Sequence, residues 1–324
     1  MTPEASLPLS YVLPIRWRDD RGLDELTAYL RWLAARVDDV VVVDGSAPAV
    51  FAEHARRWGP TVRHLRPHAD LRFASGKVNG VVTGVREAAR EHVVVADDDV
   101  RYGEDALRRM LRLLADCEVV APQNHFEPLP WHAVWDTARS LIARAVSHDM
   151  PGTLGLRREA FLGMGGYDGD VLFENLELIR TAEAAGGRVV APLDLYVRRL
   201  PPTAPHFWSQ RVRQAYDEFA RPGRMAAALA VAPAVALSPR PARAAGALAL
   251  LSVAAAEAGR RRAGGRRVFP ARTALAAPAW VAERATCAWL AVGVRLLRGG
   301  VPYGDVVMRR AATPVRRLRA RTPS

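Results

Sequence analysis

Apolar positions in the first 220 residues alternate between two periodicities. Short apolar runs predict buried strands at residues 11–15, 40–43, 92–96, 118–122 and 188–192. Apolar residues at helical spacing predict helices at residues 23–37, 74–92, 103–117, 131–147, 173–187 and 206–219. Most of these helices lie between the strands, which predicts an α/β fold with a mostly parallel central sheet flanked by helices. In such sheets ligands bind beyond the carboxyl ends of the strands.

A different pattern begins after residue 220. Alanine-rich apolar runs at residues 225–239, 244–258 and 273–296 are separated by arginine clusters. A clean membrane span takes about 20 uninterrupted apolar residues, so these runs are short or broken. We therefore expect a first domain at residues 1–220, followed by a basic, apolar helical appendage at residues 221–300 that lies on or in a membrane. A soluble alanine-rich appendage is the alternative.

The charge distribution supports this division. Residues 221–324 carry 19 arginines against Glu257, Glu283 and Asp305, whereas residues 1–220 have a net charge of −4. Because apolar runs lie between the arginine clusters, an anionic membrane surface is a better partner than nucleic acid, whose phosphates need no apolar contacts. We expect a location at the cytoplasmic face of the plasma membrane, and a flexible basic tail at residues 301–324.

Three consecutive carboxylates follow the apolar strand at residues 92–96. Strand alternation points Asp97 and Asp99 to the same side. Adjacent carboxylates repel one another unless a cation neutralises them, and hard oxygen ligands of this kind suit Mg²⁺ or Mn²⁺. The alternative is a solvated acidic turn in which one aspartate caps the next helix.

Lys77 is the only lysine in the chain, and the other 45 basic residues are arginines. It lies at the start of the helix that leads into the Asp97 strand, where a cation could meet a diphosphate. Asp44 ends an earlier strand at the same edge of the sheet. Glu174 opens a later helix, where it could act as a general base or simply favour the helix terminus.

Taken in chain order, these residues resemble the motifs of the family 2 glycosyltransferases, which have the GT-A fold. The resemblance covers about residues 9–220 and is nearest to the ceramide-glucosyltransferase-like, membrane-associated members. The family pattern is an aspartate after the second strand, a lysine in a following helix, D-x-D, E-D and Q-x-x-R-W. The matching residues are Asp44, Lys77, Asp97 with Asp99, Glu174, and Gln210 with Arg213.

The resemblance implies roles on the donor side of the site. Asp44 would contact the nucleotide base near Pro14, and Lys77 would face the diphosphate. Asp97 would contact the ribose or the metal, and Asp99 would bind the metal, Mg²⁺ or Mn²⁺. Gln210 and Arg213 would lie at the acceptor and diphosphate side.

Two positions depart from the family pattern. The E-D motif reads Glu174-Asn175, and an asparagine cannot take up a proton. Glu174 is therefore the candidate general base, with Glu177 or Asp170 as substitutes. The tryptophan of Q-x-x-R-W is Gln214, which removes an aromatic platform for the acceptor.

The resemblance implies an inverting, metal-dependent glycosyltransferase that uses a nucleoside-diphosphate sugar. We expect UDP-sugars before GDP- or dTDP-sugars, and a lipid-linked or membrane-proximal hydroxyl acceptor. A catalytically weak or inactive relative that binds nucleotide sugar in a membrane complex is the alternative, favoured by Asn175. A nucleotidyltransferase of similar topology would need a phosphate-binding loop near the N-terminus, and only residues 13–22 come near one.

Overall fold

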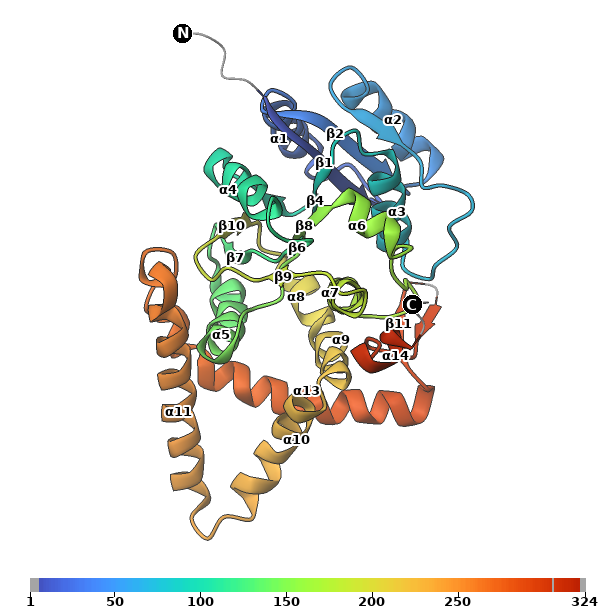
Figure 1. The fold of residues 1–324 in the computed structure, drawn as a ribbon. Coiled ribbons are helices and arrows are strands. Elements are labelled where there is room, and N and C mark those ends of the chain that lie inside the picture. Colours follow the sequence, from blue (N-terminus) through green and yellow to red (C-terminus); the bar gives the residue numbers. More distant parts are fainter. Residues whose placement is uncertain (1–5, 305, 321–324) are drawn as a thin grey trace.

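The computed structural model describes residues 6–304 and 306–320, and a mixed seven-stranded sheet lies at its centre (Figure 1). The strand order is β3-β2-β1-β4-β8-β6-β9. Strands β3, β2, β1 and β4 are parallel, and β8 runs antiparallel between β4 and β6. The strands are β1 (Leu7–Ile15), β2 (Val37–Asp44), β3 (Arg63–Leu65), β4 (His92–Ala96), β6 (Val119–Val120), β8 (Thr153–Arg157) and β9 (Val189–Val190).

Helices cover both faces of this sheet. Alternation along β1 sends Tyr11 and Leu13 into one apolar core and Val12 into another. The first core is completed by α1 (Leu23–Ala34), α4 (Glu104–Leu114) and the end of α2 (Pro48–Trp58). The second is completed by α3 (Gly76–Glu87), α6 (Arg158–Gly163) and α7 (Glu174–Ala184). A Cβ at Gly84 would collide with Val12, so glycine lets α3 approach β1 closely.

A second, three-stranded sheet lies beside the carboxyl end of β4. Its order is β5-β10-β7, with β5 (Val100–Arg101), β10 (Tyr196–Arg199) and β7 (Gln123–Phe126). Pairing of Arg199 with Val100 brings β10 next to the acidic turn after β4. The associated helices are α5 (Trp131–Val146), α8 (Ala204–Ser209), α9 (Arg211–Tyr216) and η1 (Asp217–Ala220).

The apolar runs after residue 220 are helical, as expected. They form α10 (Pro222–Ala236), α11 (Pro241–Arg261), η2 (Arg262–Arg267), α12 (Arg272–Leu275) and α13 (Ala277–Arg298). α10 and α11 make a hairpin that projects away from the sheets, and α13 crosses beneath the first domain (Figure 1). The carboxyl end of α11 packs against α5, where a Cβ at Gly259 would collide with the Leu141 carbonyl.

Among the described residues, Pro241–Arg267 is the one helical stretch long and apolar enough to cross a membrane, with a mean hydropathy of 1.2. One such helix is weak evidence for a span, because core helices of soluble proteins can pass the same test. Large apolar side chains are nevertheless exposed on the helices after residue 220 and at their ends: Leu237, Leu250, Leu251, Leu296 and Leu297.

The expectation of a flexible tail differs from the structure. The described residues after 300 include the paired strands β11 (Val301–Tyr303) and β12 (Val306–Met308), followed by α14 (Val315–Arg319). Met308 and Ala311 are buried in an apolar cluster with residues of α7, α9 and α13. The Leu172 amide donates to the Arg310 carbonyl at 2.9 Å. The apolar residues between the arginines thus hold this segment against α7, α9 and α13, a contact that the charge pattern does not indicate. Residues 321–324 of the predicted tail lie outside the described residues.

Candidate active site

A cavity of about 940 Å³ lies beyond the carboxyl ends of β1 and β4. We call it the main cavity. The structure brings six of the sequence-predicted residues to its lining: Pro14, Lys77, Asp97, Asp99, Gln210 and Arg213. The β11–β12 hairpin supplies part of the opposite wall, including Tyr303, so the predicted tail contributes to the site.

The acidic turn after β4 splits its three carboxylates between two directions. Asp97 and Asp99 face a pair of cations, whereas Asp98 accepts a hydrogen bond from Trp17 Nε1. Lys77 Nζ lies 2.5 Å from Asp97 Oδ1, and Arg199 Nε donates to Asp99 Oδ2 at 2.8 Å. Asp97 and Asp99 both contact Arg199, although residues 98 and 99 form a turn rather than the extended strand that the sequence predicts.

Asp99 retains an oxygen that the protein does not satisfy. Its Oδ1 atom is buried and has no hydrogen-bond partner among the described residues. Burial raises the pKa of Asp99, Arg199 opposes this shift, and Asp97 adds to it. A half-buried carboxylate that has one buried, unpartnered oxygen and lies beside a second carboxylate is a donor set that fits Mg²⁺ or Mn²⁺.

Lys77 joins the acidic turn to α7. Ser75 caps α3, with its Oγ accepting from the Val78 amide at 3.4 Å, and this fixes Lys77 in the first turn. Lys77 Nζ donates to Glu174 Oε1 at 2.8 Å. Burial by itself lowers the pKa of Lys77, but the Asp97 and Glu174 carboxylates outweigh it and raise the pKa above its usual value. Lys77 is thus a charged link between two acidic groups.

The substitutes for Glu174 as a general base have structural roles. Glu177 is fully buried, and its Oε2 accepts from the Thr313 amide. Asp170 Oδ1 accepts from the Ala74 amide at 2.9 Å. Neither residue is among those lining the main cavity or its neighbour described next. Glu174 lines that neighbouring pocket, although Lys77 occupies one of its oxygens.

A second pocket of about 280 Å³ adjoins the main cavity, and we call it the arginine pocket. The two share lining residues, among them Asp97, Arg199, Gln210 and Arg213. Arg213 Nη1 donates to Gln210 Oε1 at 2.9 Å, and its guanidinium lies 4.7 Å from the Tyr303 ring centroid. Gln210 and Arg213 therefore stand at the boundary between the two spaces.

Asp217 also lines the arginine pocket, although no motif in the sequence indicates it. Burial raises its pKa to about 7; Arg213 lowers the pKa, and Glu174 raises it further. Its Oδ1 has no hydrogen-bond partner among the described residues. A carboxyl with a pKa near neutrality is suited to proton transfer. Its position one helical turn after Arg213 was the available signal.

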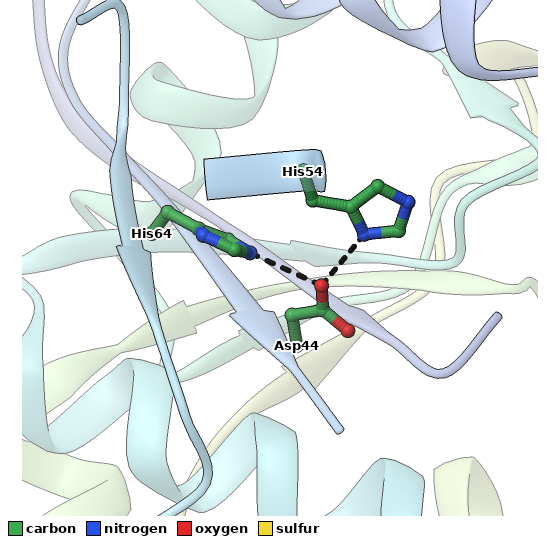
Figure 2. Close-up of side chains that lie close together, drawn as sticks. All are labelled: Asp44, His54 and His64. Atoms are coloured by element: carbon green, nitrogen blue, oxygen red, sulfur yellow. Dashed lines mark hydrogen bonds and ion pairs between the residues drawn. The ribbon is translucent and has the colours of Figure 1, made fainter. Parts of the chain in front are cut away.

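Asp44 lines neither the main cavity nor the arginine pocket, although its strand partner Ile15 lines the main cavity. Its carboxylate is fully buried, with Oδ2 at 2.7 Å from His54 Nδ1 and 3.1 Å from His64 Nε2 (Figure 2). Oδ1 accepts from the Ser46 amide at 2.8 Å. Burial raises the pKa of Asp44, but hydrogen bonds from His64, Ser46 and His54 outweigh it and hold the pKa far below its usual value. As it lies, this carboxylate is not available to a nucleotide base.

The three side chains in Figure 2 also form a group that could hold a metal ion, since their ligand atoms lie within 4.8 Å of one another. The two nitrogen–oxygen distances are those of hydrogen bonds, so each histidine already binds the carboxylate through one ring nitrogen. The other ring nitrogens, His54 Nε2 and His64 Nδ1, are buried without a hydrogen-bond partner among the described residues. His54 also stacks on Trp58 at 4.3 Å between ring centroids. We interpret the cluster as a support for the loop after β2.

Solved structures resemble this fold at low sequence identity. A mannosyltransferase from Pyrobaculum calidifontis, in complex with GDP-Man and Mn²⁺, has a TM-score of 0.51 and 20% identity, and the match covers 91% of this chain and 89% of that one. The fold is therefore the GT-A fold. Glucosyl-3-phosphoglycerate synthase from Mycobacterium tuberculosis, in complex with Mn²⁺ and UDP, matches 61% of this GT-A chain at 15% identity and a TM-score of 0.40. No protein-family model and no curated protein matches the sequence.

Proposed function

We propose that this protein is an inverting, divalent-metal-dependent glycosyltransferase of the family 2 type. One observation carries the proposal: a GT-A fold places Asp97, Asp99 and Lys77 together at the wall of one large cavity, beyond the carboxyl end of β4. Carboxylates for a metal and a lysine for a diphosphate are the groups that a nucleoside-diphosphate sugar requires. The mannosyltransferase with the same fold was solved with GDP-Man and Mn²⁺, which supports this donor class.

The residues of the acidic turn would hold the cation. Asp99, with its unsatisfied Oδ1, and Asp97 are the proposed ligands of Mg²⁺ or Mn²⁺. When bound, the metal would neutralise charge on the departing diphosphate. Lys77 would exchange one of its carboxylate partners for a diphosphate oxygen, and Arg213 could add a second cation from the other wall. Pro14 would border the nucleotide.

The chemistry is a single displacement at the anomeric carbon. An oxygen of the acceptor would form the new bond on the face opposite the diphosphate, so the configuration inverts. If the acceptor presents a hydroxyl, a base must take its proton, and Asp217 joins Glu174 as a candidate because its pKa is about 7. The arginine pocket is the place for the acceptor because it adjoins the main cavity at Asp97 and Arg199.

We also propose association with the cytoplasmic face of the plasma membrane. The α10–α11 hairpin and α13 expose leucines, with Leu237 at 84% and Leu297 at 88% exposed. Arginines flank these segments, which is typical of helices at an anionic membrane surface. A lipid or glycolipid acceptor would then reach the site from the side of these helices.

A thermal-shift screen tests the proposed donor. UDP-, GDP- and dTDP-sugars are each added with and without Mn²⁺ or Mg²⁺. At least one is expected to raise the melting temperature only when the metal is present, and Asp99→Ala should abolish that shift. Absence of a shift with every donor would contradict the proposal. A shift without sugar transfer or hydrolysis would favour the inactive relative, consistent with Asn175.

A further inference from the structure

The arginine pocket holds more cations than its carboxylates neutralise. Its six arginines come from five parts of the chain: Arg139, Arg199, Arg213, Arg221 with Arg224, and Arg284. Its carboxylates are Asp97, Glu174, Asp217 and Glu218. Arg139, Arg199 and Arg224 each have an ion pair, for example Arg224 with Glu218 at 3.1 Å. Arg221 and Arg284 have no ion pair within the described residues.

Arg284 is the most unusual of these cations. It is 4% exposed, and its Nε and Nη1 atoms are buried without a hydrogen-bond partner in the described part of the chain. Burial lowers the pKa of Arg284, and Glu283 and Glu218 oppose this shift without cancelling it. Burial together with the nearby Arg224 lowers the pKa of Arg221 to about 10. Leaving a buried charge unpaired is costly. An anion with several oxygens would satisfy both guanidinium groups, and phosphate matches their geometry.

An apolar groove begins where the arginine pocket ends. A cavity of about 260 Å³ shares Glu218, Arg224 and Arg284 with the pocket, and its remaining lining is almost entirely apolar. A further apolar cavity of about 420 Å³ shares Val231 and Val281 with it and lies among α10, α11 and α13. The lining follows α10 from Arg224 to Ala236, about 18 Å at the helical rise. We call these two cavities the apolar groove.

We propose that the arginine pocket and the apolar groove together hold the acceptor, a lipid with a phosphate monoester head and a hydrocarbon tail. The head would meet Arg221 and Arg284, and the tail would lie along α10 between α11 and α13. This inference rests on the proposed glycosyltransferase function and names its acceptor. It differs from the hydroxyl acceptor that the sequence predicts.

A phosphate acceptor also changes what the chemistry requires. A phosphate oxygen forms the bond to the anomeric carbon, the bond from that carbon to the donor's diphosphate breaks, and its electron pair leaves with the nucleoside diphosphate. A phosphate monoester has a second pKa of about 6, so its oxygens are ionised at neutral pH. No proton needs to be removed. The reaction then needs no general base. It can therefore proceed although Asn175 replaces a carboxylate and Glu174 is bound to Lys77.

Calorimetry with three probes tests the site: dodecyl phosphate, dodecanol and inorganic phosphate, each below the concentration at which it aggregates. Wild-type protein is expected to bind dodecyl phosphate at least about 10-fold more tightly than either other probe. Arg284→Gln and Arg221→Gln should each weaken that binding about 10-fold or more. Val231→Trp, which fills the groove, should weaken dodecyl phosphate binding without affecting inorganic phosphate. Arg272→Gln, an exposed arginine outside these cavities, is the matched control and should change nothing.

Each contrary result overturns the inference. If dodecanol binds as tightly as dodecyl phosphate, the site does not recognise a phosphate head. If inorganic phosphate binds as tightly, the site does not recognise a hydrocarbon tail. Dodecyl phosphate binding that ignores both arginine variants would place the ligand elsewhere. Metal-dependent binding of a nucleoside diphosphate, measured on the same samples, separates the two proposals. If it persists while dodecyl phosphate does not bind, only the acceptor inference fails; if wild-type protein binds no nucleoside diphosphate, the proposed function fails.

Discussion

The main cavity and the arginine pocket share lining residues but differ in their charged groups. The carboxylates of the main cavity are paired with cations, whereas the arginines of the arginine pocket outnumber its carboxylates. In the main cavity, Asp97 and Asp99 each have a cation within 2.8 Å, supplied by Lys77 and Arg199. In the arginine pocket, Arg284 is buried and lacks any ion pair among the described residues. The first space therefore has carboxylates to offer a metal, and the second has guanidinium groups to offer an anion.

Under the proposed function, this difference separates the two ends of a transfer reaction. A nucleotide sugar with its metal would bind where carboxylates and a lysine meet, and the proposed anionic acceptor would bind where arginines are in excess. Arg199 lies at the junction, because its side chain contacts Asp97 and Asp99 and lines both spaces. The following predictions test each side of the comparison, from the largest expected effect to the smallest.

Asp99→Asn should have the largest effect, because it removes a proposed metal ligand. Loss of an outer-shell partner commonly weakens metal binding about 10–100-fold, so loss of a ligand should weaken it about 100-fold or more. Titration with Mn²⁺ in the presence of a nucleoside diphosphate measures this. Asp98→Asn is the matched control, since that carboxylate faces Trp17, and its effect should be much smaller. Equal losses in the two variants would contradict the assignment.

Lys77→Ala should weaken nucleoside-diphosphate binding by about 1.5–3 kcal/mol, the range for a hydrogen bond to a charged group. That corresponds to about 10- to 150-fold in affinity. Lys77→Arg should restore it only in part, because a forked guanidinium does not replace a compact ammonium between Asp97 and Glu174. Arg86→Ala, on the same helix but paired with exposed Asp70, is the control. Wild-type affinity in Lys77→Arg would show that a lysine is not required.

Asp217→Asn should change the pH dependence of stability. The pKa of this carboxyl is about 7 in the folded protein and about 3.9 in an unfolded chain. Between these values the folded state binds more protons, so Asp217 makes stability fall as pH rises from about 4 to 7. The melting temperature of wild-type protein should therefore drop more between pH 5 and pH 8 than that of the variant. Parallel curves would show that Asp217 is not perturbed.

Asp44→Asn should have the smallest effect on donor affinity and a clear effect on stability. His54 and His64 would lose a buried charged partner, which should lower the free energy of unfolding by about 1–3 kcal/mol. Denaturant unfolding measures this change, and nucleoside-diphosphate titration is expected to stay within about twofold of wild type. A large loss of donor affinity without loss of stability would support the base contact that the family resemblance implies.

The sequence predicts the α/β fold class and several of its elements, because periodicity and strand ends carry this information. The helices at α3, α4 and α7, and the carboxylates after β4, lie where hydrophobic spacing places them. Lys77 and Asp97 meet because a GT-A sheet brings the start of α3 and the end of β4 to one edge. Local patterns suffice when the geometry follows from the regular alternation of strand and helix.

The parts that sequence could not reveal depend on contacts between distant segments. Asp44 is enclosed by His54 and His64, which follow it in the sequence by 10 and 20 residues. Only the folded structure shows that these side chains contact it. Arg199 reaches the acidic turn through pairing of β10 with β5. The composition did not indicate the docked segment at residues 301–304 and 306–320, because its arginines dominate the composition while a few apolar residues decide its packing.

Transfer of labelled sugar from a nucleoside-diphosphate sugar into a lipid extract tests the central claim most directly. Labelled lipid should form with wild-type protein only when Mn²⁺ or Mg²⁺ is present, and Asp99→Asn should form none. No transfer to lipid and no hydrolysis from UDP-, GDP- or dTDP-sugars, under conditions in which the metal and nucleotide bind, would contradict the assignment of this protein as a glycosyltransferase.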